Sequence, residues 1–134
     1  RREDAGMIIH AHTKKAMAVS VRKIREVPCL VEEMSQLIGG GIPITPQYVP
    51  AEQHFQLGTA AAENIGNKNG VILRNHGPVA VGRNPEEAVL MVEVIEKACE
   101  IFLDQGQMFY APISQCYIDS ERYRYLYKYG NENT

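Results

Sequence analysis

Apolar positions along the chain follow two spacings, and their alternation predicts strands and helices in turn. Gly6 to His12 is a short apolar run of strand length, and Thr13 then supplies a hydroxyl that can cap a helix ending near Val21. The clearest helix begins after Asn84, with Pro85 in its first turn. Apolar residues recur in it every three or four positions and predict one buried stripe. The stripe consists of Ala88, Met91, Val92, Ile95, Ala98, Cys99 and Phe102.

Shorter patterns fill the rest of the chain with alternating strands and helices. A hairpin or sharply kinked pair is predicted around the His-Gly-Pro bend at 76–78, and the glycines at 39–41 predict a chain reversal. Strands alternating with helices predict an α/β fold in which helices cover a sheet. The remaining expected elements are a strand at 28–31, a helical turn at 32–38, an extended segment at 42–45, a helix at 51–65, strands at 71–76 and 78–82, and a last helix within 118–133.

Composition narrows the class of protein. A chain of 134 residues, 45% of them apolar, supports one modest core and hence a single domain over residues 1–134. A net charge of −2 without a basic stripe argues against nucleic acid as a partner. The chain has no apolar run long enough to span a membrane and no signal-like start. Three widely spaced cysteines suit a reducing compartment, so we expect a cytoplasmic protein.

Histidines provide the candidate chemistry. Residues two apart on a strand face the same side, so His10 and His12 present two imidazoles together. A catalytic metal site needs about three protein ligands, and His76 ends another apolar strand. Gly77 beside it leaves room for a ligand near the backbone. His54 lies in a polar helical stretch and is expected to be a solvated surface residue. The competing interpretation of His10 and His12 alone is a half-exposed strand without metal.

The segments Ile8 to Thr13 and Leu73 to Pro78 resemble the class II aldolase/adducin family. The resemblance covers nearly all of the chain, which corresponds to the C-terminal portion of the family domain. It implies a layered α/β/α domain with a central, mainly antiparallel sheet covered by helices. It also implies that His10, His12 and His76 bind a divalent metal, with Zn²⁺ expected first and Mn²⁺, Co²⁺ or Fe²⁺ as alternatives.

Within this family the chain is most similar to the L-fuculose-phosphate aldolases and L-ribulose-5-phosphate 4-epimerases. The resemblance implies a metal-dependent lyase that cleaves a phosphorylated ketose, such as L-fuculose 1-phosphate, to dihydroxyacetone phosphate and an aldehyde. Pentulose-phosphate epimerisation and sugar-phosphate dehydration or decarboxylation are alternatives. A non-catalytic, adducin-like assembly module is an alternative of another class, against which the retained histidines argue. The expected partners are a small phosphorylated sugar and further copies of the chain in a homotetramer.

Two further residues are candidates for proton transfer. The upstream glutamate of the aldolases and their phosphate-binding loops have no counterpart in this sequence. Glu33, and less so Glu32, matches an acid/base glutamate of the methylthioribulose-phosphate dehydratase branch, although both could be solvated glutamates that begin a helix. Tyr129 resembles the carboxy-terminal tyrosine that reaches a neighbouring subunit's site, although the tyrosines at 123, 125 and 127 suggest a packing cluster instead.

Arg74 and Asn75 flank the third histidine directly in the sequence. Metal-binding histidines are commonly oriented by neighbours that do not touch the ion. A role in orienting His76 is therefore expected for both residues.

Overall fold

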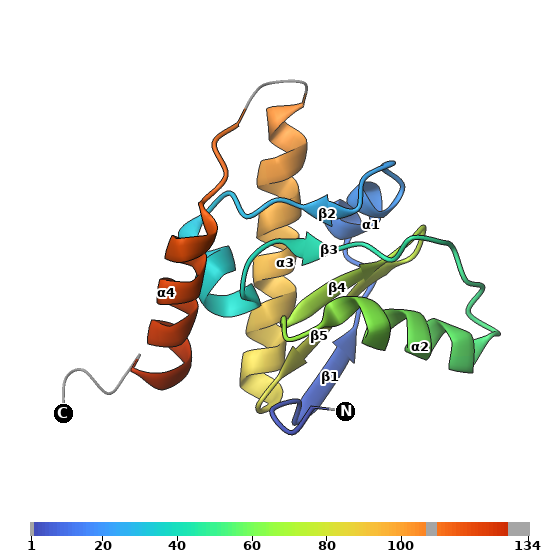
Figure 1. Ribbon diagram of the computed structural model, residues 1–134. Coiled ribbons are helices and arrows are strands. Elements are labelled where there is room, and N and C mark those ends of the chain that lie inside the picture. The colour runs from blue at the N-terminus through green and yellow to red at the C-terminus, as the bar shows by residue number, and fades with distance from the viewer. Residues whose placement is uncertain (1, 107–109, 129–134) are drawn as a thin grey trace.

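The computed structural model describes residues 2–106 and 110–128, and these form strands and helices in close alternation (Figure 1). The strands are β1 (Met7–His10), β2 (Glu26–Val27), β3 (Ile42–Pro43), β4 (Gly70–Leu73) and β5 (Gly77–Gly82). The helices are α1 (Lys14–Ser20), the π-helix η1 (Met34–Ile38), α2 (His54–Ile65), α3 (Pro85–Gln105) and α4 (Gln115–Tyr127).

A three-stranded antiparallel sheet in the order β1-β5-β4 forms the centre of the fold. Ile9 pairs with Ala80 on one side of β5, and Ile72 pairs with Pro78 on the other. The strands β2 and β3 form a separate antiparallel pair. Figure 1 shows α3 running along one face of the three-stranded sheet and α2 lying over the other. The expected layered α/β/α architecture with a mainly antiparallel sheet is therefore confirmed.

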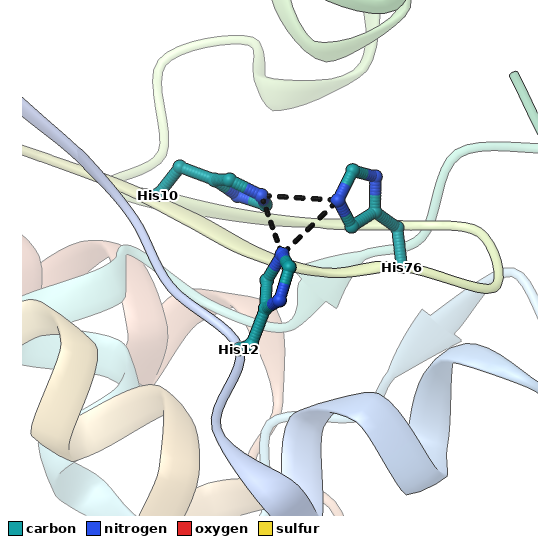
Figure 2. A group of neighbouring side chains, drawn as sticks. All are labelled: His10, His12 and His76. Atoms are coloured by element: carbon teal, nitrogen blue, oxygen red, sulfur yellow. Dashed lines mark hydrogen bonds between the residues drawn. The ribbon is translucent and has the colours of Figure 1, made fainter. Parts of the chain in front are cut away.

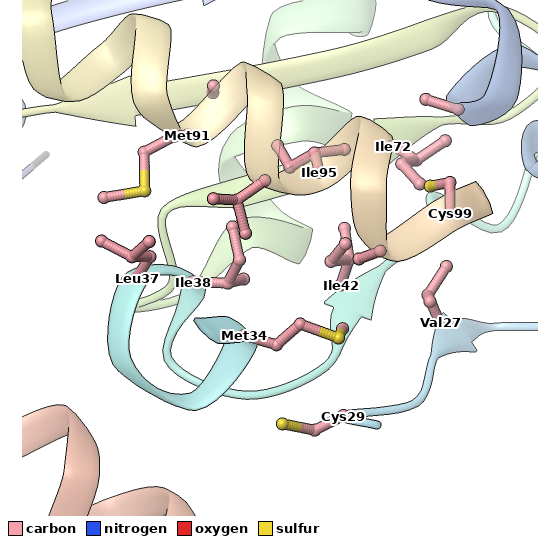
Figure 3. Close-up of a cluster of buried hydrophobic side chains, with 14 of the residues drawn as sticks. Val27, Cys29, Met34, Leu37, Ile38, Ile42, Ile72, Met91, Ile95 and Cys99 are labelled. Carbon is pink, nitrogen blue, oxygen red and sulfur yellow. The ribbon is translucent and has the colours of Figure 1, made fainter. Parts of the chain in front are cut away.

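The main core surrounds α3, which packs against the sheet, against η1 and against the β2–β3 pair (Figure 3). The predicted stripe of α3 faces this core, and Met91, Ile95 and Cys99 have no exposed surface. Val92 and Phe102 are partly buried at its margin. Asn84 caps α3 as predicted, because its side chain accepts a hydrogen bond from the backbone N–H of Glu87. The spacing of apolar residues was thus sufficient to identify both the helix and its buried face.

Several local predictions were wrong in their bounds or type. The strand expected at 28–31 lies instead at Glu26–Val27, where it pairs with β3. By contrast, the helical turn expected at 32–38 is confirmed: residues 34–38 are π-helical, and the helix stops before Gly39, whose φ is 99°. The helix α2 begins at His54 rather than Ala51. Finally, β4 stops at Leu73, so the strand pair is joined by a turn at residues 74–76.

The last helix, α4, packs against η1 through a half-buried guanidinium. Arg122 donates hydrogen bonds to the backbone carbonyls of Gln36 and Leu37 and to the side-chain oxygen of Asn69. On the neighbouring turn of α4, Tyr125 donates to a carboxylate oxygen of Glu87 at 2.6 Å. These bonds explain why a helix with a weakly apolar sequence is held on the domain. Across 2–106 and 110–128, no helix has both the length and the apolarity needed to cross a membrane.

Candidate metal centre

Three histidines converge from three parts of the chain at one end of the sheet (Figure 2). His10 is the last residue of β1, His12 lies in the connection to α1, and His76 lies in the turn between β4 and β5. The Nε2 atom of His10 is 3.1 Å from that of His12 and 3.2 Å from that of His76. The Nε2 atoms of His12 and His76 are 3.1 Å apart. The residues that the sequence singled out are therefore brought together.

The ring of His10 is oriented by the backbone of the neighbouring strand. Its Nδ1 lies 3.0 Å from the carbonyl oxygen of Pro78. A carbonyl can only accept, so Nδ1 carries the proton, and the Nε2 of the neutral ring is left with a lone pair. That lone pair points into the histidine cluster. Fixing the second ring nitrogen in this way is the usual means by which proteins orient a metal-binding histidine.

Hydrogen bonds alone cannot satisfy the three nitrogens. Each neutral Nε2 is either a donor or an acceptor, so at least one of the three pairs must set two lone pairs or two protons against each other. A cation between three lone pairs removes this conflict. Nitrogens about 2.0–2.1 Å from one ion lie roughly 2.9 Å apart at a right angle and roughly 3.3 Å apart at a tetrahedral angle. The observed spacings fall between these values, so the donor set fits a divalent metal.

His76 is held in an irregular turn. Asn75 adopts a left-handed conformation with φ of 58°, and its N–H donates to the carbonyl of Ser20. The guanidinium of Arg74 donates to the carbonyls of Ile24 and Thr45. Burial lowers the pKa of His76, and the neighbouring charges of His10 and His12 lower it further. The shift favours the neutral imidazole, which is the form that binds metal.

Gly77 has a different role from the one expected. A Cβ atom at this position would lie 2.6 Å from the carbonyl oxygen of Ala11 and 3.5 Å from Cδ2 of His12. The missing side chain therefore makes room for the loop that contains His12, rather than for a ligand. His12 itself lies beyond the end of β1, so the strand period alone does not account for its convergence with His10.

A cavity of about 740 Å³ extends from the histidines between the sheet and α2. Its walls are mostly aliphatic, and the exposed side chain of His54 and the guanidinium of Arg2 also border it. Arg2 donates to a carboxylate oxygen of Asp4 at 2.6 Å and to two backbone carbonyls, so its charge is already partnered. The larger aliphatic side chains are Ile8, Val71, Leu73, Val79 and Val81 from the sheet, and Leu57 and Ile65 from α2.

The candidate proton carrier Glu33 and its neighbour Glu32 do not join the histidine cluster. Glu33 precedes η1, and its carboxylate accepts hydrogen bonds from Nζ of Lys97 at 2.8 and 3.1 Å. Lys97 belongs to α3, which covers the other face of the sheet from α2 (Figure 1). Neither Glu32 nor Glu33 borders the cavity. Tyr129 lies outside the described residues, and its role stays a prediction.

The fold and the histidine cluster together define a protein of the class II aldolase type. The profile of the family described as Class II Aldolase and Adducin N-terminal domain matches residues 1–103, and the chain belongs to this family. It is 36% identical to alpha-adducin of Mus musculus over 104 residues, which are 75% of this chain and 13% of that protein. It is 26% identical to the L-fuculose phosphate aldolase of Escherichia coli K12 over 102 residues, which are 76% of this chain and 46% of the aldolase.

Solved structures show the same fold at low sequence identity. An L-fuculose 1-phosphate aldolase superimposes with a TM-score of 0.85 and 22% identity, covering 94% of this chain and 58% of the aldolase chain. A putative aldolase/epimerase/decarboxylase from Escherichia coli superimposes with a TM-score of 0.69 and 20% identity, covering 86% of this chain and 56% of the other. The chain thus spans about half the length of the aldolases that it matches.

Proposed function

We propose that the protein is a divalent-metal-dependent lyase that cleaves a phosphorylated ketose by a retro-aldol reaction. The observation that supports this most directly is the mutual approach of three Nε2 atoms at 3.1–3.2 Å. Membership of the class II aldolase/adducin family supports the same reaction class. The similarity to L-fuculose phosphate aldolases makes L-fuculose 1-phosphate the first substrate to test. Dihydroxyacetone phosphate and an aldehyde would be the products.

In this mechanism the histidines bind the ion through neutral nitrogens. A divalent ion held there would supply Lewis acidity toward a substrate carbonyl. His10 contributes a lone pair fixed by its hydrogen bond to Pro78, and the lowered pKa of His76 favours the neutral form of that ring. Zn²⁺ suits three imidazoles best, with Mn²⁺, Co²⁺ or Fe²⁺ as substitutes.

Proton transfer requires a further group, and Glu33 does not reach the histidines of its own chain. Glu33 is paired with Lys97 on the α3 side of the domain. Its proposed acid/base role therefore requires a second copy of the chain to present it to the histidines. The homotetramer implied by the family resemblance would provide such a copy. Glu33→Gln should then lower kcat without lowering metal content. Tyr129 remains the other candidate for proton transfer.

The first experiment measures bound metal per chain by elemental analysis after purification. We expect about one divalent ion per chain in the native protein. His12→Ala and His76→Ala should lose it. His54→Ala is the matched control, because His54 borders the same cavity but lies outside the cluster. A folded native protein that binds no added Zn²⁺ would contradict the proposal.

The second experiment tests the reaction itself. Release of dihydroxyacetone phosphate from L-fuculose 1-phosphate is followed by coupling it to NADH oxidation. We expect activity that is removed by a chelator, restored by added metal and absent in His76→Ala. Stoichiometric metal without cleavage would exclude the aldolase assignment for this substrate. The remaining metal-dependent alternatives would then be the pentulose-phosphate epimerases and the sugar-phosphate dehydratases or decarboxylases.

A second candidate is an adducin-like, non-catalytic assembly module. The 36% identity to alpha-adducin favours it, since this exceeds the identity to the aldolases. Such a module would need no metal ligands. Failure of the native protein to bind metal, together with stable self-association in analytical ultracentrifugation, would favour this candidate over the lyase.

A further inference from the structure

The start of α1 is held by a residue that is distant in the sequence. Thr13 occupies the N-cap position, but its hydroxyl makes no capping hydrogen bond and is buried without a partner. The carboxylate of Glu96, on α3, accepts from the backbone N–H of Lys15 at 2.9 Å and from that of Ala16 at 3.0 Å. These are the second and third helical positions, whose N–H groups an N-cap side chain normally satisfies. Glu96 thus replaces the missing local cap.

This contact bears directly on His12. The loop with His12 contains three residues between β1 and α1, and its first, Ala11, is fixed by an N–H bond to the carbonyl of Pro78 at 3.2 Å. The far end of the loop is fixed by the two bonds that Glu96 accepts. With both ends held, the loop leaves little freedom for the Cα atom of His12.

The other end of α1 contacts the turn that contains His76. The carbonyl of Ser20, the last residue of α1, accepts from the N–H of Asn75 at 3.1 Å. The guanidinium of Arg74 donates to the carbonyls of Arg22 and Ile24 just beyond the helix. One short helix therefore joins the two irregular segments that present His12 and His76. A shift of its N-terminus relative to α3 would change the spacing of the two rings.

We propose that Glu96 is a positioning residue for the histidine cluster: by binding the N-terminus of α1 to α3, it sets the place of His12 relative to His10 and His76. The inference rests on the proposed function, because it assumes that the cluster binds a divalent ion. Glu96 does not border the cavity and acts through the backbone of α1. Local sequence contains no sign of this role, since 80 residues separate Glu96 from Ala16.

The test compares the Zn²⁺ affinity of the native protein, Glu96→Ala, Glu96→Gln and Glu100→Ala by competition with a chromophoric chelator. Glu100 is the matched control, because it lies one turn further along α3 and pairs with the side chain of Lys15 at 3.7 Å, leaving the backbone bonds untouched. We expect Glu96→Ala to weaken binding about tenfold, as for other residues that orient metal ligands. Glu96→Gln retains one acceptor oxygen and should fall between Glu96→Ala and the native protein.

Two readouts separate positioning from general stability. The visible spectrum of the Co²⁺-loaded protein should change in Glu96→Ala and stay native in Glu100→Ala, because it reports the ligand geometry. Hydrogen exchange of the Lys15 and Ala16 amides in the metal-free protein should accelerate in Glu96→Ala. Native affinity and a native Co²⁺ spectrum in a folded Glu96→Ala protein would overturn the inference while leaving the proposed function intact.

If Glu96→Ala does not fold, Glu96→Gln decides: native affinity and spectrum in that variant would overturn the inference. Absence of metal binding in the native protein itself would overturn the inference together with the proposed function. The native measurement thus separates failure of the metal site from failure of the positioning role.

Discussion

The two faces of the sheet differ in how completely they are covered. On one face, α3 buries seven of its residues, among them Met91 and Ile95. On the other face, only Ile65 is buried among the residues of α2, and Phe55 is 82% exposed. The first face has a continuous core, whereas the second encloses the aliphatic cavity beside the histidines. We infer that the α3 face of the sheet mainly stabilises the fold, whereas the α2 face provides the space for a ligand.

Among the tests of this contrast, truncation of a core residue on the α3 face should change the free energy of unfolding most. Ile95 is fully buried between α3 and the sheet, and Ile95→Ala should lower the free energy of unfolding by about 2–5 kcal/mol. Leu57→Ala, on the partly exposed α2, should lower it by less than about 1 kcal/mol. Urea denaturation followed by circular dichroism measures both. Equal losses in the two variants would mean that α2 stabilises the fold as much as α3 does.

Lowering the pH should destabilise the α3 face of the protein by protonating Glu87. Burial alone would raise the pKa of this carboxyl, but hydrogen bonds from Arg83 and Tyr125 outweigh it and lower the pKa from 4.5 to about 2. The folded value lies below the unfolded one, so the contribution is complete above pH 4.5 and is lost as the pH falls toward 2. Its size is on the order of 3 kcal/mol.

Glu87→Gln should therefore destabilise the protein at neutral pH and flatten its stability profile between pH 4.5 and 2. Glu86→Gln is the matched control, because Glu86 is the exposed neighbour in the first turn of α3. Denaturant titrations at a series of pH values measure both profiles. An unchanged acid dependence in Glu87→Gln would show that the Arg83–Glu87–Tyr125 network does not control acid stability.

Two glycines allow the histidine face to be tested, one next to His76 and one on α2, which lines the cavity. Gly77→Ala places a Cβ against the carbonyl of Ala11 and should cost about 1–3 kcal/mol, with weaker Zn²⁺ binding because His12 is displaced. Gly58 lies within α2, and a Cβ added there would meet no atom within 4 Å, so Gly58→Ala should stabilise by about 0.5–1 kcal/mol. Thermal unfolding and chelator competition measure the pair. If Gly58→Ala weakened metal binding and Gly77→Ala did not, the proposed effect of Gly77 on the position of His12 would be wrong.

Sequence reasoning succeeded where the signal is local and periodic. The stripe of α3 and its Asn84 cap follow from neighbours within two turns, and so does the pair of strands around Gly77. The π-helical form of η1 was not predictable, because its carbonyls at Gln36 and Leu37 are satisfied by Arg122 from α4. The short strand β2 was misplaced because its position depends on pairing with β3.

In the candidate site, too, local sequence identifies the residues, whereas long-range contacts set their positions. The residue types of the cluster were predictable from the histidine spacing and the family resemblance. The positions of the rings depend on long-range contacts, such as the Pro78 carbonyl at His10 and the close approach of Ala11 to Gly77. Thr13 illustrates the limit: its position suggested a cap, but the cap is supplied by Glu96.

Thiol labelling perturbs the protein least, because it measures the accessibility of the α3 core without a substitution. Burial raises the pKa of Cys99 to about 12 from its ordinary 9.0, and the nearby charge of Glu96 adds to the shift. Since the thiolate is the reactive form, roughly a thousandfold less of it exists at pH 8 than for an unperturbed thiol. Cys116 is exposed on α4 and should react first with iodoacetamide, as mass spectrometry of timed samples would show. In urea the two rates should converge, whereas equal rates in the native state would mean that the α3 core exposes Cys99 as readily as the surface exposes Cys116, and that the α3 face is not the closed side of the sheet.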